Sequence, residues 1–402
     1  MKKRPLDTEL AELDRQHLIR QRTTIDGFVE PGNRLVTTAE GRTLVDFSSN
    51  DYLGLAHHPA VAAAMSESAS RTGAGSGASH LVTGHGIEHE RLEEELAAFT
   101  GRERALLFST GYMANVGVIT ALADRGESVL LDRLSHASII DGALLSGARL
   151  KRYAHADADA AQRMLSLEQS VLLATDGVFS MDGDIAPLAR LAQAAKAHDA
   201  WFVVDDAHGI GVLGKNGRGS TEELSPEDVS VLVGTFGKAF GSFGAFVAGS
   251  RDLIEYLIQK ARSYIYTTAL PQPVAAATRK SLDIAQREPW RRERVLALTA
   301  RFRKGARAAQ LRLLDSNTPI QPVVLGSADA ALQIQAELFA AGFRVVAIRS
   351  PTVPKGSERL RITLSAAHTE EQVDALVEKL ARIQAARIAR ERSDIGVGLP
   401  NE

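Results

Sequence analysis

The chain has 402 residues, enough for one large hydrophobic core and a second, smaller one. Its 47 lysine and arginine residues nearly balance its 49 aspartate and glutamate residues, and a net charge of -2 without long runs of one sign argues against nucleic acid or an anionic membrane as the main partner. The absence of cysteine excludes disulfides, thiolate metal sites and cysteine nucleophiles.

The N-terminal segment, MKKRPLDTELAELDRQ, is basic and then acidic and has no apolar core of signal-peptide length. No later stretch reaches the roughly 20 continuous apolar residues that a membrane span requires. We therefore expect a cytoplasmic protein in which residues 1–45 form an N-terminal arm.

Short apolar runs alternate with amphipathic stretches through residues 46–270, which predicts a large α/β domain with a mostly parallel central sheet covered by helices. The runs that we expect to form strands are ALLFS (105–109), SVLLD (128–132), SVLLATDGV (170–178), WFVVDDAH (201–208) and VSVLVGT (229–235). A further run, GAFVAGS (244–250), is typical of an edge or antiparallel strand.

The pattern changes near Leu270, where Pro271 and Pro273 interrupt the chain. A long helical pattern follows, and strand and helix patterns then mix. We expect residues 271–390 to form a smaller α+β domain with the N-terminal arm beside it, and residues 391–402 to form a disordered tail.

Polar residues lie at or just beyond the carboxyl ends of the expected strands. In an open α/β sheet this edge binds ligands, so residues far apart in the sequence converge on one crevice. These residues are Asp176, Ser180, Asp205, His208, Thr235 and Lys238.

Lys238 lies in GTFGKAFGSFGA (234–245), where four glycines and no other charged residue surround it. A solvated surface turn is one interpretation. A phosphate-binding P-loop is excluded, because Leu232 stands where its first glycine belongs and Ala239 where its hydroxyl belongs. A third interpretation is a lysine that forms a Schiff base, since small neighbours let a planar cofactor lie against the amine.

The run WFVVDDAHGIG places Asp205 at the end of a buried strand and His208 three residues later. Such a carboxylate can pair with a cationic ring nitrogen of a ligand that the histidine also reaches. The alternative is structural, with Asp206 capping a turn and His208 packed inside the protein. His136, in RLSHASIID, either stacks on a planar cofactor or only begins a helix.

Two glycine-containing segments bear on cofactor binding. In STGYMANVGVIT (109–120), Gly111 opens a helix directly after a strand, where free N–H groups and the helix dipole suit a phosphate. TGAGSGASHLVTGHG (72–86) matches the dinucleotide fingerprint, but no apolar strand precedes it. A flexible loop beside the active site is the better interpretation of this second segment.

The segment RLRITLSAAH places Arg359 and Arg361 on one face of a strand. A guanidinium there can bind a substrate carboxylate through two hydrogen bonds, although an edge strand with a solvated face explains the pattern equally well. Together the segments supply a reactive amine, a partner for a ring nitrogen, a phosphate site, a stacking ring and a carboxylate clamp. Pyridoxal phosphate (PLP) acting on an amino acid needs this set.

Long motifs in a fixed order cover nearly the whole chain. They are FSSNDYLGL, GSGASHLVTGHGIEHERLEEELA, ALLFSTGYMAN, DRLSHASI, DGVFSMDGDIAPL, VDDAHGIGVLG, TFGKAFGSFGA, IYTTALP and IRSPTVPKGSERLRITLSAAH. With these motifs the sequence resembles the α-oxoamine synthases, PLP-dependent acyltransferases of the fold-type I aminotransferase architecture. The resemblance implies a homodimer with shared active sites. SSNDYLGL, DDAHGIGVLG and PTVP favour the members that join L-alanine to a pimeloyl thioester in biotin biosynthesis, releasing carbon dioxide and a free thiol.

The resemblance also implies roles for individual residues. Lys238 would hold the cofactor covalently and act as the base, Asp205 would pair with the ring nitrogen, and His136 would stack on the ring. The cofactor-binding residues that it implies are Gly111, Tyr112, Ser180, Asp205, His208, Thr235, Lys238 and, from a second subunit, Thr268. The substrate-binding residues that it implies are Arg20, Asn50, His136, Thr352 and Arg361, with Arg22 as a neighbour of Arg20 and Ser350 as a departure from the frequent Pro-Pro-Thr pattern. It implies no metal site.

Three alternatives stay open. A sister synthase would use glycine with an acetyl, succinyl or long acyl thioester, and a fold-type I lyase or aminotransferase would share Asp205 and Lys238. A metal-dependent hydrolase built on Asp205, Asp206, His208 and His136 lacks a clear further ligand and leaves Lys238 unexplained. The acyl donor is either coenzyme A or a carrier protein.

Overall fold

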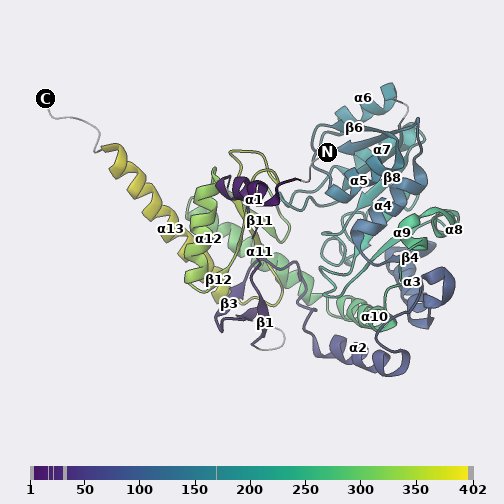
Figure 1. Ribbon diagram of the computed structural model, residues 1–402, viewed down its shortest axis with the longest axis horizontal. Coiled ribbons are helices and arrows are strands. Elements are labelled where there is room, and N and C mark those ends of the chain that lie inside the picture. The colour runs from purple at the N-terminus through teal and green to yellow at the C-terminus, as the bar shows by residue number, and fades with distance from the viewer. Residues whose placement is uncertain (1–3, 17, 21, 30–33, 169, 397–402) are drawn as a thin grey trace.

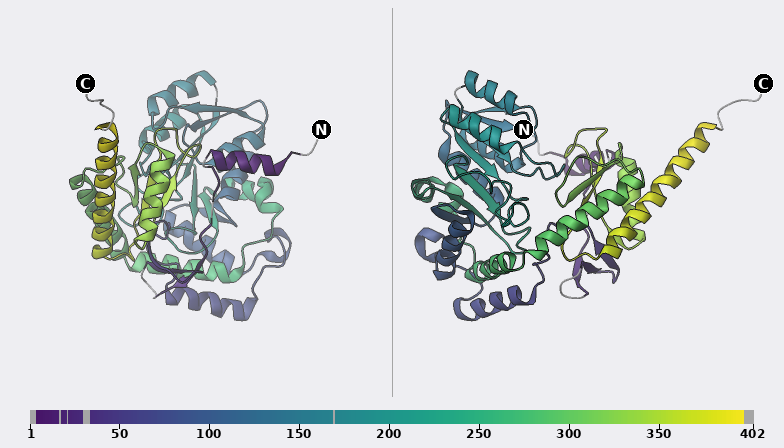
Figure 2. Two further views of the ribbon diagram at one scale, coloured as in Figure 1. Left: turned by 60° about the vertical axis from the view of Figure 1, so that its left-hand side comes forward. Right: turned by 180° about the vertical axis from the view of Figure 1, so that it is seen from behind.

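The computed structural model describes residues 4–16, 18–20, 22–29, 34–168 and 170–396. The chain forms two bodies side by side, a larger one around a central sheet and a smaller one at the C-terminal side (Figure 1). Helix α11 (Trp290–Ala308) runs from the larger body into the smaller one, as the view from behind shows (Figure 2). No helix in the described ranges is long and apolar enough to cross a membrane.

The larger body contains a seven-stranded sheet with the order β4-β10-β9-β8-β7-β5-β6. Its strands are β4 (Arg104–Phe108), β5 (Ser128–Asp132), β6 (Arg149–Tyr153), β7 (Ser170–Asp176), β8 (Trp201–Asp205), β9 (Val231–Thr235) and β10 (Ala245–Gly249). Strands β6, β5, β7, β8 and β9 pair in parallel, whereas β10 is antiparallel to both β4 and β9. The predicted α/β class with a mostly parallel sheet is therefore confirmed.

The run predicted as an edge or antiparallel strand, 244–250, is antiparallel and lies between two strands. Two other details of the sheet differ from the prediction. Strand β6, at one edge of the sheet, was not predicted, because RLKRY is mostly polar and only Tyr153 is fully buried. Strand β8 also ends at Asp205 rather than continuing to residue 208, since the amide of Ala207 turns back to the Asp205 side chain at 3.0 Å.

Helices cover both faces of this sheet because successive strand residues point to opposite faces. Ala105 and Leu107 of β4 pack on the face covered by α3, while Leu106 and Phe108 pack on the face covered by α4, α5 and α8. The helices of the larger body are α2 (Pro59–Thr72), α3 (Ile87–Thr100), α4 (Gly111–Leu122), α5 (Ala137–Ser146), α6 (Ala158–Glu168), α7 (Leu188–Ala197), α8 (Arg251–Lys260), α9 (Arg262–Ile265) and α10 (Gln272–Arg287), with the short π-helix η1 (His80–Gly84).

The smaller body combines a three-stranded sheet, β11-β14-β13, with a four-stranded sheet, β1-β2-β3-β12. Its strands are β1 (Ile25–Phe28), β2 (Leu35–Thr38), β3 (Thr43–Asp46), β11 (Ile320–Val324), β12 (Phe343–Arg344), β13 (Val346–Ile348) and β14 (Arg359–Thr363), and its helices are α1 (Leu6–Arg15), α11, α12 (Ala328–Ala340) and α13 (Glu370–Gly396). Strand β3 pairs in parallel with β12, so the N-terminal and C-terminal parts of the chain share one sheet.

The domain boundaries that the sequence predicts, 45/46, 270/271 and 390/391, stay predictions. Helix α13 continues through Gly396, past the start of the expected tail, because residues 370–395 contain only helix-compatible residues and neither glycine nor proline. Residues 397–402 of that tail lie outside the described residues.

Candidate active site

Parallel strands bring the predicted polar residues to one edge of the larger sheet. Asp176 and Asp205 are the last residues of β7 and β8, and the strand register sets them opposite each other. Burial raises the pKa of Asp176 well above its ordinary value, and the negative charge of Asp205 raises it further. A buried carboxyl group with a raised pKa therefore stands beside Asp205.

The side chain of Asp205 is fixed by a network that continues to His136. Asn115 of α4 donates its amide to Asp205 Oδ2 at 2.6 Å and to Ser138 Oγ at 2.9 Å. Ser138 Oγ in turn lies 2.7 Å from His136 Nδ1. This network orients one carboxylate oxygen of Asp205 and links it to the exposed ring of His136.

Asp206 has the structural role that the sequence left open. It is fully buried and accepts hydrogen bonds from the amide and hydroxyl of Ser220 at 2.8 and 2.6 Å, while burial raises its pKa to about 7. Its side chain therefore holds the loop that follows β8 and is not free to bind a ligand.

Lys238 follows β9 by three residues and is half-buried. Burial lowers the pKa of its amine, and the carboxylates of Asp205 and Asp176 oppose this shift. The bond from the amide of Gly241 to the carbonyl of Lys238, at 2.9 Å, closes a tight turn around it. The surface-turn interpretation is thus wrong about solvation, since the lysine faces the ionisable groups of the sheet edge.

The N-terminus of α4 forms a cradle next to Thr235. Thr110 caps this helix by accepting the amide of Met113 at 3.1 Å, which leaves the first-turn amides of Gly111 and Tyr112 without an intrahelical acceptor. A side chain added at Gly111 would project to within 3.9 Å of Thr235 Cβ and fill the space between α4 and β9. The space is therefore of the kind that an anion occupies at a helix N-terminus.

Arg361 is held by groups from both bodies. Its Nε donates to the carbonyl of Ser180 at 2.6 Å, and its Nη1 donates to Asn50 Oδ1 at 3.1 Å and Thr363 Oγ1 at 3.0 Å. Strand β14 lies between β11 and β13, and Arg359 and Arg361 are both buried. The alternative of an edge strand with a solvated face is therefore wrong.

His208 is connected to Arg361 through Tyr52. Tyr52 Oη lies 2.6 Å from His208 Nδ1, and Arg361 hydrogen-bonds the same phenol. Burial raises the pKa of Tyr52 to about 12 and lowers that of His208 well below its ordinary value, the latter helped by the positive charges of Lys238 and Arg361. His208 is thus a neutral, oriented imidazole.

The residues expected to contact an acyl substrate line a separate cleft. Arg20, Arg22 and Thr352 all border a cavity of about 1020 Å³ between the N-terminal segment and the α12–β13 region. Its remaining lining combines apolar side chains such as Phe339 with further arginines such as Arg349. The cleft thus offers an apolar wall and several positive charges.

The glycine-rich loop is anchored beside Thr268. The amide of Ala269 donates to the carbonyl of Ala78 at 2.9 Å, and His89 Nε2 hydrogen-bonds the carbonyl of Leu270. Thr268 itself is exposed, and its carbonyl accepts from Ser109 Oγ at 3.4 Å.

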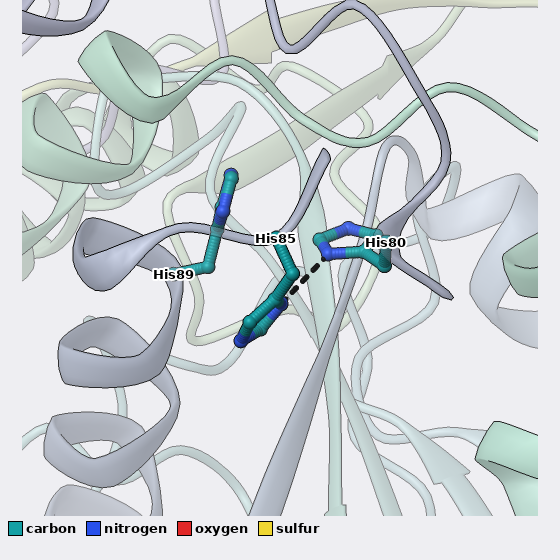
Figure 3. Close-up of side chains that lie close together, drawn as sticks. All are labelled: His80, His85 and His89. Carbon is teal, nitrogen blue, oxygen red and sulfur yellow. Dashed lines mark hydrogen bonds between the residues drawn. The ribbon is translucent and has the colours of Figure 1, made fainter. Parts of the chain in front are cut away.

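Two histidines of this loop, His80 and His85, lie close to His89 of α3 (Figure 3). His80 Nδ1 lies 2.9 Å from His85 Nδ1, and His85 Nε2 lies 2.9 Å from Glu90. His89 Nδ1 accepts the amide of Gly86 at 2.9 Å, so both nitrogens of His89 already have backbone partners. Hydrogen bonds account for this cluster, which ties the loop to α3.

The set proposed for a metal-dependent hydrolase does not form a metal centre in the structure. Among the residues with described positions, the groups of histidine and acidic side chains close enough to share an ion lie elsewhere, at His80/His85/His89, His85/Glu90/Glu93 and His155/Asp182/Asp184. None of them includes Asp205, Asp206, His208 or His136.

Two residues of the site were missed by sequence reasoning. Tyr52 lies two residues after Asn50 in the motif FSSNDYLGL, but its contact with His208 spans 156 residues. Asn115 is a fully buried polar residue in the apolar helix α4, and a lone polar residue on a core-facing helix position is the signal that could have found it.

The residues present fit PLP. The cradle at Gly111 and Thr235 suits its phosphate, the oriented carboxylate of Asp205 suits its ring nitrogen, and the half-buried amine of Lys238 suits its aldehyde.

Comparison with known proteins agrees with this fit. Residues 42–380 match the aminotransferase class I and II family. A curated relative from Thioalkalivibrio sulfidiphilus (strain HL-EbGR7), named 8-amino-7-oxononanoate synthase, is 57% identical over 384 residues, which make up 94% of this chain and 97% of the relative.

Solved structures share the whole architecture. A serine palmitoyltransferase variant from S. paucimobilis, solved with bound PLP and myriocin, is similar with a TM-score of 0.88 at 31% identity, covering 95% of this chain and 97% of that one. An 8-amino-7-oxononanoate synthase from Francisella tularensis is similar with a TM-score of 0.76 at 32% identity, covering 86% of this chain and 99% of that one.

Proposed function

Because the chain belongs to the class I and II aminotransferase family and, within it, to the 8-amino-7-oxononanoate synthases, we propose that it joins L-alanine to a pimeloyl thioester in biotin biosynthesis. The reaction forms a bond between the alanine α-carbon and the acyl carbonyl carbon, expels the thiol, and releases the alanine carboxylate as carbon dioxide. The product is 8-amino-7-oxononanoate.

One observation carries this proposal most directly. The half-buried amine of Lys238 lies near the carboxyl groups of Asp205 and Asp176 at the edge of a parallel sheet, and the buried, positively charged Arg361 is also close enough to affect its pKa. A reactive amine, an anchor for a ring nitrogen and a carboxylate clamp thus converge on one place, as PLP chemistry on an amino acid requires.

The chain's own residues would hold PLP at its two ends. The amides of Gly111 and Tyr112 and the hydroxyls of Thr235 and Ser180 would bind the phosphate. At the other end, Asp205 would keep the ring nitrogen protonated.

The ring between these ends would be held by histidines and by the covalent lysine. His208 would donate to the ring hydroxyl, since Tyr52 binds its Nδ1 and leaves Nε2 to carry the proton. His136 would lie against the ring face, and Lys238 would hold PLP covalently until substrate replaces it. When bound, PLP supplies an electron-withdrawing ring that stabilises negative charge at the α-carbon of the amino acid.

Substrate binding and proton transfer fall to Arg361 and Lys238. Arg361, oriented by Asn50 and the Ser180 carbonyl, would bind the alanine carboxylate. Lys238 Nζ would take the proton from the alanine α-carbon and return one to the product. Its lowered pKa suits this role, because a larger share of the amine is then free to accept a proton.

The acyl substrate would enter by the cleft that Arg20, Arg22 and Thr352 border. Its apolar wall suits the methylene chain of a pimeloyl group, and an arginine suits the terminal carboxylate of that chain. Following the sequence motifs, we assign this contact to Arg20.

We further propose a homodimer in which Thr268 contacts the partner's cofactor. Thr268 is exposed, and the neighbouring apolar side chains Tyr266 and Val82 are 71% and 73% exposed, which supports a contact surface here. The cytoplasmic location stays a prediction from the sequence.

The proposal is tested by the visible absorption spectrum of the PLP-loaded protein during additions of L-alanine, glycine and then pimeloyl-coenzyme A, with thiol release followed in parallel. We expect a band that responds to alanine at lower concentration than to glycine, and thiol release only when alanine and the thioester are both present. A spectral response favouring glycine, with thiol released from acetyl- or succinyl-coenzyme A, would assign the chain to a sister synthase. No band after incubation with PLP would refute the cofactor assignment.

A further inference from the structure

A short hairpin, residues 178–185, carries Ser180 into the candidate site. Val178 and Ile185 pair as an antiparallel bridge. The amide of Phe179 donates to the carbonyl of Asp184 at 3.0 Å, and the amide of Gly183 donates to the carbonyl of Phe179 at 2.8 Å. This 178–185 hairpin carries Ser180, whose carbonyl orients Arg361 at 2.6 Å.

One side of the hairpin is tied to the smaller body. Arg359 of β14 forms an ion pair with Asp182. Ser316 Oγ and Thr318 Oγ1 each donate to the carbonyl of Gly183 at 2.9 Å. These contacts come from the same body as Arg361. The base of the hairpin follows β7 directly, and the amide of Gly177 donates to the carbonyl of Asp205 at 2.8 Å.

The other side is tied to the central sheet by His155. Its Nε2 lies 2.9 Å from Asp184 Oδ2, and its Nδ1 lies 3.1 Å from Asp132 Oδ1 at the end of β5. The ring also packs edge-on against Phe179, with 4.4 Å between centroids and an interplanar angle of 84°. One imidazole thus bridges a strand end and the hairpin.

Both ring nitrogens of His155 face carboxylates, and a carboxylate oxygen can only accept. Both bonds are therefore complete only when the ring carries two protons. A third carboxylate, that of Asp182, lies nearby. One of its oxygens is within 4.8 Å of a ring nitrogen of His155 and of a carboxylate oxygen of Asp184. Burial lowers the pKa of His155, but the hydrogen bonds and charges of Asp132 and Asp184 outweigh it and raise this pKa to about 10.

Asp132 extends the connection to His136. Its Oδ1 accepts the amide of Leu134 at 2.8 Å, and its carbonyl accepts the amide of Ser135 at 3.1 Å. The turn that precedes His136 is therefore built on the carboxylate that His155 neutralises. Asp132 is almost fully buried, so it depends on a cation to offset the cost of burying its charge.

From this geometry we propose that His155, as a permanent imidazolium held between Asp132 and Asp184, is a positioning residue of the active site that fixes Ser180 and Arg361 relative to the central sheet. It touches neither substrate nor cofactor. Its effect on PLP passes through the Ser180 hydroxyl, and its effect on the amino acid passes through the Ser180 carbonyl and Arg361. The inference rests on the proposed function for these two roles, but the charge of the ring does not.

The charge of the ring is measured directly by NMR of the protein with isotope-labelled histidine, at about pH 8, where an unperturbed histidine is neutral. The resonance is assigned by its loss in the His155→Gln variant. We expect both nitrogens of His155 to be protonated. A neutral His155 ring at that pH would overturn the proposal, whatever the protein catalyses.

The positioning role is measured by PLP affinity and by steady-state kinetics. His155→Gln and Asp184→Asn should each weaken PLP binding to the apoprotein roughly tenfold and raise the KM for alanine more than they lower kcat. The double variant should be no worse than His155→Gln alone, because loss of the His155 ring already removes the contact that Asp184→Asn weakens. The matched control is His198→Gln. His198 is partly exposed, and its Nε2 lies 3.2 Å from the Ser166 hydroxyl, so this variant should leave the PLP affinity and the KM for alanine unchanged.

PLP affinity is read without turnover, so failure of the synthase assignment leaves this test intact. If His155→Gln does not fold, PLP binding is titrated with Asp184→Asn instead, in which His155 is still present. Wild-type PLP affinity in both variants, or a double variant whose loss equals the sum of the two, would overturn the proposal.

Discussion

Asp176 and Asp205 face each other across two parallel strands, and the pKa of Asp176 is raised by burial and then by the charge of its neighbour. Two buried carboxyl groups this close share one negative charge more easily than they hold two. Asp205 is the member of the pair whose carboxylate is oriented by Asn115 and by the Ala207 amide.

The first prediction concerns that charge. Asp205→Asn keeps the shape of the side chain but removes the partner of the ring nitrogen, so turnover should fall by at least about 100-fold. PLP should still bind through the cradle at Gly111 and through Lys238. The measurement is turnover together with cofactor stoichiometry, with Asp206→Asn as a comparison that should mainly reduce stability. Turnover within a few-fold of wild type in Asp205→Asn would contradict the assignment.

Replacement of Lys238 tests the covalent role. Lys238→Ala should abolish turnover and covalent attachment, because the chain then offers no amine at this position. Borohydride treatment of the PLP-loaded protein followed by mass spectrometry of the peptide around residue 238 checks this, with Lys215→Ala, a lysine of an exposed loop, as the control. A PLP adduct elsewhere in the chain, with turnover intact, would refute the role of Lys238.

Removing the phenol of Tyr52 should separate His208 from Arg361. Tyr52→Phe leaves the buried His208 Nδ1 without the partner now at 2.6 Å and removes an acceptor from Arg361. We expect kcat to fall roughly tenfold, in line with the cost of one unsatisfied buried group. Tyr256→Phe, at a side chain that is 44% exposed, should behave as wild type. An unchanged kcat would show that His208 needs no partner for its orientation.

Glu93 of α3 should make stability depend on pH. It is buried and accepts the amide of Leu107 at 3.0 Å, and burial raises its pKa from 4.5 to about 8. Between these values the unfolded chain releases the proton while the folded protein keeps it, so this group lowers stability progressively as pH rises from 4.5 to about 8.

Glu93→Gln does not titrate and should therefore be more stable than wild type at high pH, by up to about 5 kcal/mol, and nearly equal to it below pH 4.5. Urea unfolding across this range measures the difference. Glu94→Gln, on the exposed face of the same helix, should show no such trend. A constant difference across all pH values would rule out titration as the cause.

The cleft residues give a test of acyl recognition. Arg20→Ala should raise the KM for the pimeloyl thioester roughly tenfold and leave the KM for alanine unchanged, because it removes a partner for the distal carboxylate. Arg22→Ala is the matched control from the same cleft. A larger effect from Arg22→Ala would transfer the contact to that residue.

Apolar patterning predicted the central sheet well, because its strands are buried on both faces and read as continuous apolar runs. Apolar patterning missed β6, because its sequence RLKRY is that of an edge strand with solvent-exposed residues. Apolar patterning also could not decide whether the strand that carries Arg359 and Arg361 lies at the edge or in the middle of its sheet. Alternation reports which side chains share a face, whereas burial of β14 depends on β11 and β13 beside it.

The site was predicted where its residues follow strand ends, as Asp205 and Lys238 do. What the sequence could not show are contacts between distant segments. Tyr52 meets His208 across 156 residues, and His155 meets Asp184 across 29 through a hairpin whose position depends on the smaller body. Such pairs are set by the packing of whole elements, and no local pattern encodes them.

The pairing of β3 with β12 has a consequence for the order in which the protein is made. Residues 45 and 46 can pair with residues 343 and 344 only after about 300 further residues have been synthesised. The carbonyl of Tyr52 likewise accepts the amide of Ala366 only after that residue has been added. At ordinary rates of synthesis, roughly 5–20 residues per second, the segment that carries Asn50 and Tyr52 stays unpaired for about 15–60 s after it leaves the ribosome. Lys238, Asp176 and Asp205 can be in place well before then, whereas Arg361 meets Asn50 only when translation is almost finished. With the roles proposed above, a ribosome that stalls in the last tenth of the message leaves a chain that has the proposed cofactor residues but not the proposed carboxylate site.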